Sequence, residues 1–483
     1  MLASELLGSK WSSKFEDFDV KGIAYDSRKV CKGYIFVCIK GFETDGHKYV
    51  SGAIENGAEA IVAEEKLDGT DLPVFYYENT RIALAELACK FYNYPSEKFD
   101  LIGVTGTNGK TTTTYLLKSI METDGKCVGV IGTNQNIIGD KVLVTQTNIP
   151  TTPNSLELQQ MFDEMARGGA DCVIMEVSSH ALDLGRVHGC SFTTGAFTNL
   201  TQDHLDFHKT MENYMNAKAK LFDICDHGAI NIDDEYGKKI LALNKCKDTL
   251  TYGVDNEADV RAENISINAR GTDFDLIYLG QKYHTHIAIP GKFSVYNALT
   301  AATIALGMEI DAEAVIEGLE RAHGVLGRVE VVPTDTDYTV IIDYAHTPDG
   351  LENIIKAVKE FATGRVITLF GCGGDRDNTK RAIMGEIAGK LSDFTIITSD
   401  NPRTEEPEKI VSQIEEGMKR TNGEYKIIVN RRDAIEWALG FAKKDDIIIL
   451  AGKGQETYQI IGKEKHDFDE RVVVYNSLNN LKK

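Results

Sequence analysis

Hydrophobic and polar positions follow two alternating patterns along this chain. Short apolar runs predict buried strands, and between them lie segments whose apolar residues recur at helical spacing. The clearest runs predicted to be strands are residues 101–104, 172–176, 194–198, 340–343, 365–370, 394–398 and 447–450, and the clearest helical segments are residues 155–167, 348–362, 380–391 and 408–420. Strands that alternate with helices in this way predict an α/β protein with mostly parallel sheets.

The same pattern divides the chain into three predicted domains, the number expected for 483 residues at ordinary domain size. Residues 1–97 predict a small N-terminal α/β domain, which ends near a proline-containing break at residues 94–96. Residues 98–327 predict a central domain with a mostly parallel sheet, to which the alternating residues 259–290 add antiparallel strands. Residues 328–483 predict a C-terminal doubly wound, Rossmann-like domain.

The strand at 101–104 runs into a turn with the features of a phosphate-binding loop. Gly106 and Gly109 lie in this turn, and Lys110 and Thr111 open the helix that follows. Glycines let backbone N–H groups approach phosphate oxygens, and a helix N-terminus adds a positive partial charge. The lysine can reach the outer phosphates of a nucleotide, and the hydroxyl can bind Mg²⁺. The match to the strict pattern is imperfect, because Val104 stands where that pattern has its first glycine. An ordinary strand-to-helix turn is the less favoured alternative, because such a turn has no use for Gly109-Lys-Thr-Thr at a helix start.

Polar residues follow two more strands of the same predicted sheet. Glu176 ends the run 172–176, and His204 comes after the run 194–198. Parallel strands place such residues at the ligand-binding edge of a sheet, and Mg²⁺ prefers oxygen ligands. A metal site is therefore favoured over a solvated carboxylate and a capping or core histidine. Lys218, on a helix predicted over 211–225, would by itself be interpreted as a solvated lysine.

Composition and charge exclude several other classes of protein. The formal net charge of −20 argues against nonspecific binding to nucleic acid or acidic lipid. Nine cysteines without a C-x-x-C pair predict reduced thiols in a cytoplasmic protein and argue against zinc. The sequence has no apolar run long enough to cross a membrane, and its N-terminus predicts a short helix rather than a signal peptide.

A set of motifs in a fixed order carries a family resemblance. The set comprises Gly106-Thr-Asn-Gly-Lys-Thr-Thr, Glu176-Val-Ser-Ser-His, Asn199-Leu-Thr-Gln-Asp-His-Leu-Asp, Asn297, Gly327-Arg328-Val-Glu and Asp343-Tyr-Ala-His-Thr-Pro-Asp. In this order it resembles the Mur ligase family, whose members build the peptide of bacterial peptidoglycan, over essentially the whole chain. The motifs Gly371-Cys-Gly-Gly-Asp-Arg-Asp and Asp400-Asn-Pro-Arg resemble those of the members that add diaminopimelate.

The resemblance implies an ATP-dependent, amide-forming ligase that uses Mg²⁺. In such a reaction ATP phosphorylates the γ-carboxylate of D-glutamate in UDP-N-acetylmuramoyl-L-alanyl-D-glutamate, and the amine of meso-2,6-diaminopimelate attacks the acyl phosphate. The protein mainly positions the reactants and neutralises phosphate charge. We also expect a cytoplasmic monomer in peptidoglycan synthesis that neither binds nucleic acid nor inserts into a membrane.

The resemblance also implies roles for single residues. ATP would be bound by Gly106, Thr107, Asn108, Gly109, Lys110, Thr111, Thr112, Asn297 and Arg328. The metal would be bound by Thr111, Glu176, His204 and a carbamylated Lys218, and catalysis would use Lys110, Lys218, His204 and Asp343. The N-terminal domain would bind UDP, and the UDP-muramoyl-dipeptide would contact Ser27, Thr151, Thr152, Ser178 and Arg186. Diaminopimelate would contact Arg376, Asp400, Asn401, Pro402, Arg403, Gly452 and Glu456. Leu184 and Leu326 depart from the family pattern, at one substrate contact and at a hinge.

Several alternatives stay open at this point. L-lysine could replace diaminopimelate, but only the latter has a distal carboxylate for an arginine fork such as that of Arg403, aimed by Pro402. A folylpolyglutamate synthase would share the phosphate turn and the domain order. A motor or transporter ATPase would usually have a strand ending in Asp where this chain has Glu176. A non-catalytic nucleotide-binding protein would not need Lys110.

Overall fold

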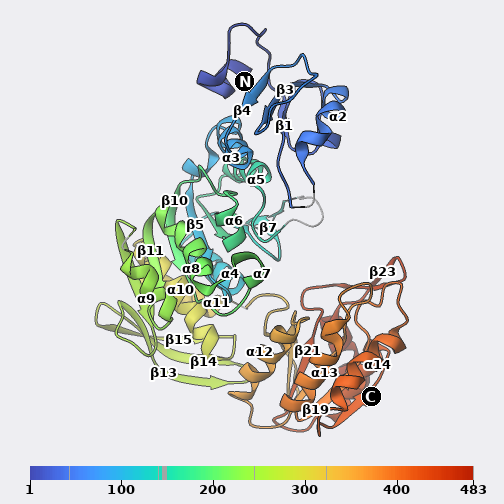
Figure 1. Cartoon of the computed structure of the whole chain (residues 1–483). Helices are drawn as coiled ribbons and strands as arrows, with labels where there is room; N and C mark the ends of the chain where they lie inside the picture. Colours follow the sequence, from blue (N-terminus) through green and yellow to red (C-terminus); the bar gives the residue numbers. More distant parts are fainter. Residues whose placement is uncertain (43, 140, 144–149, 244, 323, 482–483) are drawn as a thin grey trace. The chain divides into compact units, whose positions relative to one another are not determined.

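The computed structural model describes residues 1–483 except 43, 140, 144–149, 244, 323 and 482–483, and it confirms the α/β class (Figure 1). The chain forms two compact units. Unit 1 comprises Met1–Thr114, Met121–Tyr252 and Thr303–Glu309, and unit 2 comprises Tyr115–Ile120, Gly253–Ala302 and Ile310–Lys483. The domain limits at residues 97 and 327 stay predictions.

A small parallel sheet forms the N-terminal part of unit 1, with its strands in the order β1-β2-β3-β4. Its elements are α1 (Ala3–Leu7), β1 (Gly22–Ala24), β2 (Tyr34–Val37), α2 (Val50–Glu55), β3 (Ala58–Ala63), β4 (Val74–Tyr76), α3 (Thr80–Phe91) and the 3-10 helices Gly8–Lys10, Ser27–Lys29, Gly46–Tyr49 and Pro95–Glu97. The Asp26 carboxylate caps the 3-10 helix of Ser27 by accepting a hydrogen bond from the Arg28 N–H. Aspartate is a good cap because its oxygen satisfies an otherwise unpaired N–H group.

The central sheet of unit 1 is built around β5 (Asp100–Thr105), the strand that precedes the phosphate turn. β5 pairs in parallel with β9 (Cys172–Glu176) on one side and β10 (Phe192–Phe197) on the other. The strands of unit 1 follow the order β12-β11-β10-β5-β9-β6-β7-β8. The three central strands are almost wholly buried, as expected for parallel strands that are covered on both faces. Their carboxyl ends are therefore neighbours at one edge of the sheet.

The other elements of this part are α4 (Lys110–Thr123), β6 (Val128–Ile131), β7 (Asn136–Ile138), β8 (Lys141–Val142), α5 (Ser155–Arg167), α6 (Ser179–Asp183), α7 (Leu205–His208), α8 (Met211–Ala219), β11 (Cys225–Asn231), α9 (Glu235–Ala242) and β12 (Asp248–Gly253). The helix predicted over 211–225 is wrong at its C-terminal end. α8 stops at Ala219, a 3-10 turn (Lys220–Asp223) follows, and Cys225 opens β11 opposite Phe192 of β10. Strand pairing therefore overrides the helical pattern there.

The segment predicted to be antiparallel at residues 259–290 is confirmed in unit 2. β13 (Val260–Asn268), β14 (Gly271–Tyr278) and β15 (Gln281–Ile287) pair as an antiparallel meander, and α10 (Lys292–Gly307) and α11 (Ala312–Arg321) follow. Buried residues alternate with more exposed ones along most of β14, which is the expected pattern for a strand with one solvated face.

A six-stranded sheet forms the C-terminal part of unit 2, in the order β16-β17-β21-β18-β19-β20, with β16 antiparallel to β17. The elements of this part of the chain are β16 (Glu330–Val332), β17 (Thr339–Asp343), α12 (Pro348–Lys359), β18 (Val366–Phe370), α13 (Thr379–Leu391), β19 (Phe394–Ile397), α14 (Pro407–Met418), β20 (Tyr425–Ile427), α15 (Arg431–Phe441), β21 (Ile447–Ala451), β22 (Tyr458–Ile461), β23 (Glu464–Asp467) and α16 (Glu470–Leu481). Of these, β22 and β23 form a separate two-stranded sheet. The other pairings of the six-stranded sheet are parallel, as a doubly wound domain requires.

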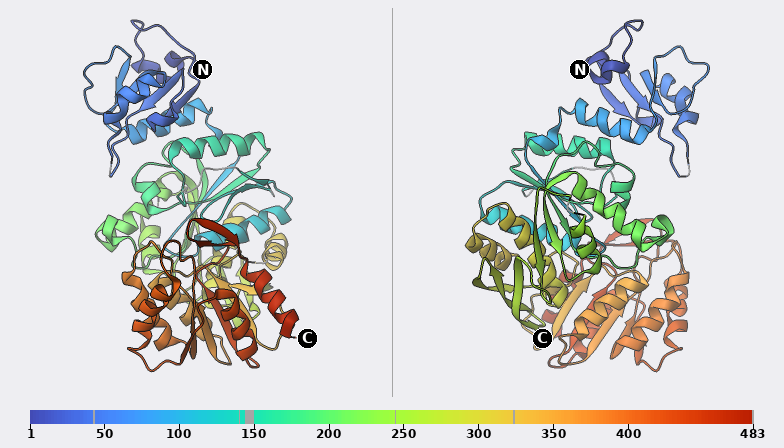
Figure 2. Two further views of the ribbon diagram at one scale, coloured as in Figure 1. Left: turned by 90° about the vertical axis from the view of Figure 1, so that its right-hand side faces the viewer. Right: turned by 60° about the vertical axis from the view of Figure 1, so that its left-hand side comes forward.

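Helices cover both faces of this C-terminal sheet. Residues of α12, α13 and α14 share one buried cluster with the sheet, and residues of α15 and α16 share the other (Figures 1 and 2). The sequence did not predict the β22–β23 hairpin or α16. In the described residues, the structure contains no helix with the length and apolar character that a membrane span needs.

Candidate active site

The phosphate turn, residues 106–109, connects β5 to α4 by backbone conformations that need glycine. Gly106 has φ of +150° and Gly109 has φ of +88°. A Cβ atom on Gly106 would overlap the hydroxyl of Thr198, just after β10. The turn therefore lies directly against the end of the neighbouring strand and presents backbone rather than side chains.

Asn199 anchors the turn, a role that the sequence did not assign although the residue lies in a quoted motif. Its carbonyl accepts from the Thr107 N–H at 2.8 Å, and its side-chain oxygen accepts from the Asn108 N–H at 3.0 Å. The Thr198 hydroxyl donates to the Asn108 carbonyl at 2.7 Å. These bonds hold the turn in a fixed shape.

Two lysines point their amines at the same carbonyl of the turn. Lys110 Nζ donates to the carbonyls of Gly106 (2.9 Å) and Thr107 (2.8 Å), and Lys218 Nζ donates to that of Gly106 at 2.7 Å. Lys218 is only 1% exposed. Burial, and then repulsion from Lys110, hold the pKa of Lys218 well below its ordinary value. The residues suit an anionic ligand such as phosphate, which would relieve this repulsion.

Thr111 and Glu176, two of the residues predicted to bind Mg²⁺, contact each other beside the turn. The Thr111 hydroxyl donates to Glu176 Oε1 at 2.9 Å, and Thr133 donates to the same carboxylate through its N–H (2.9 Å) and its hydroxyl (3.1 Å). A hydroxyl and a carboxylate are suitable ligands for Mg²⁺, which also keeps several waters. Across the described residues, no group of three or more His, Cys, Asp or Glu side chains is placed to hold a metal ion.

His204 and Lys218 both lie near one aromatic ring, that of Tyr214. The ring of Tyr214 is centred 4.5 Å from Lys218 Nζ and 6.2 Å from the His204 ring. His204 has φ of +51°, and its ring also lies 4.9 Å from that of His180. His204 and Lys218, the two residues predicted to serve a second metal ion, are therefore both close to Tyr214, and Lys218 also contacts the phosphate turn.

Four of the residues predicted to hold the UDP-muramoyl-dipeptide also come together. The Thr152 hydroxyl donates to the Glu176 carbonyl (2.8 Å) and accepts from the Ser178 N–H (3.0 Å), and Arg186 Nη1 donates to the Thr152 carbonyl (2.9 Å). Thr133 links Thr151 to this group at 3.1 Å. Burial lowers the pKa of Arg186, whose Nε is buried without a hydrogen-bond partner among the described residues. Such an N–H suits an oxygen ligand. Ser27 opens a 3-10 helix in the N-terminal sheet region.

Asn297, Arg328 and Asp343 belong to unit 2, whereas the phosphate turn belongs to unit 1, so their joint role at ATP stays a prediction. Burial raises the pKa of Asp343, whose two oxygens accept from the N–H groups of Val329 and Ala345, each at 2.8 Å. The Arg328 guanidinium lies 5.1 Å from the centre of the Tyr344 ring. Asn297 is buried within α10.

At the carboxyl ends of β19 and β21, Asn401 and Glu456 meet over a lysine that the sequence did not single out. Lys453 is fully buried, and its Nζ donates to Asn401 Oδ1 at 3.2 Å and to Glu456 Oε2 at 3.1 Å. Asn401 Nδ2 donates to the same Glu456 oxygen at 2.9 Å. A Cβ on Gly452 would crowd Asp400 Oδ2 at 2.8 Å. The signal for Lys453 was its place between Gly452 and Gly454, next to a strand end.

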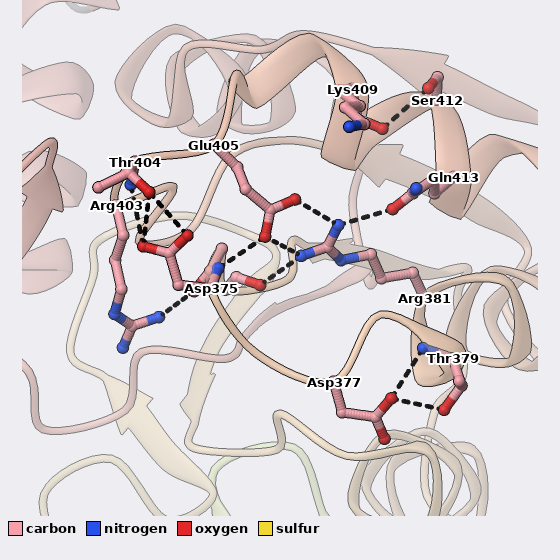
Figure 3. A network of polar contacts seen from close by, with 12 residues as sticks. Asp375, Asp377, Thr379, Arg381, Arg403, Thr404, Glu405, Lys409, Ser412 and Gln413 are labelled. Carbon is pink, nitrogen blue, oxygen red and sulfur yellow. Dashed lines mark hydrogen bonds and ion pairs between the residues drawn. The ribbon is translucent and has the colours of Figure 1, made fainter.

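Arg376 and Arg403, two of the residues predicted to contact diaminopimelate, both lie close to Gly373. A Cβ on Gly373 would be 2.9 Å from Arg403 Nη1 and 3.8 Å from Arg376 Cγ. Arg403 Nη1 donates to the Gly374 carbonyl at 2.7 Å (Figure 3). Arg403 has φ of +51°, uncommon for a residue other than glycine. Two cations of this kind suit a carboxylate.

Three family models match the chain. The "Mur ligase family, catalytic domain" matches residues 19–92, the "Mur ligase middle domain" residues 104–305 and the "Mur ligase, glutamate ligase domain" residues 327–454. A UDP-N-acetylmuramoyl-L-alanyl-D-glutamate–2,6-diaminopimelate ligase of Clostridium acetobutylicum is 50% identical over 96% of this chain and 95% of that protein.

Solved structures agree with this similarity. A UDP-N-acetylmuramoyl-L-alanyl-D-glutamate–2,6-diaminopimelate ligase structure superposes with a TM-score of 0.72 at 31% identity, covering 96% of this chain and 95% of the other. A Mycobacterium tuberculosis folylpolyglutamate synthase shares the fold alone, with a TM-score of 0.60 at 18% identity over 77% of this chain and 91% of that one. From its matches to relatives and family models, this chain belongs to the Mur ligase family.

Proposed function

We propose that this chain is an ATP-dependent ligase that joins meso-2,6-diaminopimelate to UDP-N-acetylmuramoyl-L-alanyl-D-glutamate in peptidoglycan precursor synthesis. The observation that carries the proposal is the phosphate turn, where Lys110 and Lys218 converge on one carbonyl beside the Thr111–Glu176 pair. The names of the 50% identical relative and of the 31% identical structure support the substrates. A cytoplasmic monomer remains the expectation.

The reaction begins with transfer of the γ-phosphoryl group of ATP to the γ-carboxylate of the D-glutamate residue, with release of ADP. The neutral amine of diaminopimelate then attacks the acyl carbon, and the tetrahedral intermediate expels phosphate as the amide forms. Lys110 would neutralise charge on the transferred group, and the N–H groups of the turn would orient the phosphates. Arg186, Thr152 and Ser178 would hold the muramoyl-dipeptide.

One Mg²⁺ would be held by Thr111 and Glu176, and a second ion would lie near His204 and Lys218. When bound, these ions would neutralise phosphate charge. Lys218 suits a carbamate because its lowered pKa makes the neutral amine available to react with CO₂, releasing one proton. The product would be an anionic oxygen ligand in place of a buried cation.

Diaminopimelate is proposed over L-lysine because two arginine side chains, those of Arg376 and Arg403, approach Gly373. A distal carboxylate would pair with them, whereas the ammonium of lysine would be repelled. The carboxylate of Glu456 would face the ammonium of diaminopimelate.

A phosphate-release assay with each substrate omitted in turn tests the proposal. We expect phosphate only when ATP, UDP-muramoyl-dipeptide and an amino acid are all present, a higher kcat/KM for meso-diaminopimelate than for L-lysine, and no ligation by a folded Lys110→Ala variant. Phosphate release without the acceptor substrates would favour an ATPase. Equal or better use of lysine would overturn the diaminopimelate assignment but leave the ligase assignment intact.

A further inference from the structure

Arg381, on α13, is a fully buried arginine that no step of the proposed reaction uses. Its guanidinium pairs with both oxygens of Glu405, Nη1 with Oε2 and Nη2 with Oε1, each at 2.9 Å (Figure 3). It also donates to the Gly373 carbonyl (2.9 Å) and to Gln413 Oε1 (2.6 Å). The two-pronged pairing fixes the orientation of both side chains.

This ion pair fastens together the loops that follow β18 and β19. Glu405 Oε1 accepts from the Asp375 N–H at 2.6 Å. The Asp375 carboxylate in turn accepts from the Thr404 hydroxyl (2.8 and 3.0 Å) and from the Thr404 N–H (3.2 Å). Each loop is thus bound to the other by side chains at several points (Figure 3).

The fastened loops are those that carry Arg376 and Arg403. Asp375 and Arg403 have φ of +53° and +51°, so both sit in a backbone region that residues with a side chain rarely adopt. Such conformations persist only where the surroundings hold them. A Cβ on Gly374 would also overlap the Pro402 carbonyl, so the two loops pass each other without spare room. The ion pair supplies the restraint that these strained residues need.

Stability alone is a weak reason to keep such a pair. Burying a guanidinium is costly, and replacing a buried ion pair by apolar residues is often neutral. Positioning is the remaining role, because a carboxylate is bound bidentately only when the receiving cations are held at a set distance and angle.

We propose that Arg381 and Glu405 are positioning residues that set the spacing of Arg376 and Arg403 for the distal carboxylate of the amino-acid substrate. This inference rests on the proposed function, and it assigns the substrate specificity of that site to a pair that does not touch substrate. Loosening the pair should weaken the recognition of diaminopimelate while the nucleotide and muramoyl-dipeptide sites keep their properties.

The test compares Arg381→Lys and Glu405→Gln with a matched ion pair in the same sheet. Arg365 and Asp446 also pair at 2.6 Å, beside the opposite ends of β18 and β21. We expect KM for diaminopimelate to rise about tenfold or more in the first two variants, with kcat and the KM for ATP and UDP-muramoyl-dipeptide little changed. Arg365→Lys and Asp446→Asn should lower the melting temperature without changing KM for diaminopimelate.

If the Arg381 and Glu405 variants do not fold, Thr404→Val still tests the inference. It removes only the hydroxyl bonds to Asp375, and KM for diaminopimelate should still rise severalfold. Unchanged KM in the folded variants, or an equal rise for all three substrates, would overturn the inference. Failure of the unaltered enzyme to prefer diaminopimelate over lysine would instead overturn the proposed function.

Discussion

At the scale of single residues, Lys218 shows how burial changes an interpretation. Its position on a helix favoured a solvated lysine, but the side chain is almost fully buried and its amine bonds to the Gly106 carbonyl. A buried lysine is costly unless its charge is removed or paired. The structure therefore excludes the solvated lysine and leaves a functional amine as the better explanation.

Replacement of Lys218 by Ala should leave the enzyme nearly inactive, because no anionic oxygen could then form at this position. Short-chain carboxylates added to the assay should restore part of the activity by supplying the missing ligand. The measurement is the ligation rate with and without added acetate or propionate. Lys220→Ala is the matched control, since that lysine is more exposed and pairs with Asp183 at 2.6 Å, and it should stay active. A fully active Lys218→Ala enzyme would contradict the assignment.

At the scale of elements, the turn between β5 and α4 depends on a close approach that only glycine permits. Gly106→Ala would place a methyl group on the Thr198 hydroxyl and strain a backbone with φ of +150°. We expect ATP affinity to fall strongly, because the N–H groups of the turn would lose their alignment. Gly125→Ala is the control, because its φ is also positive (+84°) but nothing lies within 4 Å of a new Cβ. Calorimetric titration of ATP should separate the two, and equal affinities would argue against the turn as the phosphate site.

The Arg381–Glu405 ion pair, which involves the loop between β19 and α14, should make the stability of the protein depend on pH in acid. Arg381 lowers the pKa of Glu405 from 4.5 to about 2. A carboxyl group with a depressed pKa in the folded state stabilises the protein above its unfolded pKa, and this contribution is lost as the pH falls through the folded value. The difference in unfolding free energy between the unaltered protein and Glu405→Gln should therefore shrink between pH 4.5 and 2. Urea titrations of both proteins across this range measure it, and a constant difference would contradict the pairing.

At the scale of the whole molecule, the residues assigned to ATP are divided between two compact units. Lys110 and Thr111 belong to unit 1, and Arg328 belongs to unit 2. Catalysis would then need the parts to be brought together by substrate, as closing domains do in other enzymes. The radius of gyration from X-ray scattering should fall when an ATP analogue and UDP-muramoyl-dipeptide are both bound. Identical scattering with and without ligands would argue against closure.

The sequence by itself determined the α/β class, most strands and helices, and the phosphate turn. These follow from local rules: a strand buried on both faces is an unbroken apolar run, as in β21, and a phosphate turn needs glycines between a strand and a helix. β23 escaped prediction because all four of its residues are polar and exposed, and β22 because it is short and only half-buried. The predicted end of α8 was wrong because Cys225 and the residues after it form β11, which pairs with β10.

Only the tertiary structure decided which polar residues act together. Thr111 and Glu176 are 65 positions apart in sequence, and Lys218 and Gly106 are 112 apart, yet each pair is joined by a hydrogen bond. Hydrophobic periodicity could not reveal Lys453 or the Arg381–Glu405 pair. A single charge in a helix or loop is usually solvated, so nothing in the sequence indicated that Lys453 and Arg381 would be buried. Local pattern specifies which backbone forms, whereas burial and charge pairing depend on neighbours that come from distant parts of the chain.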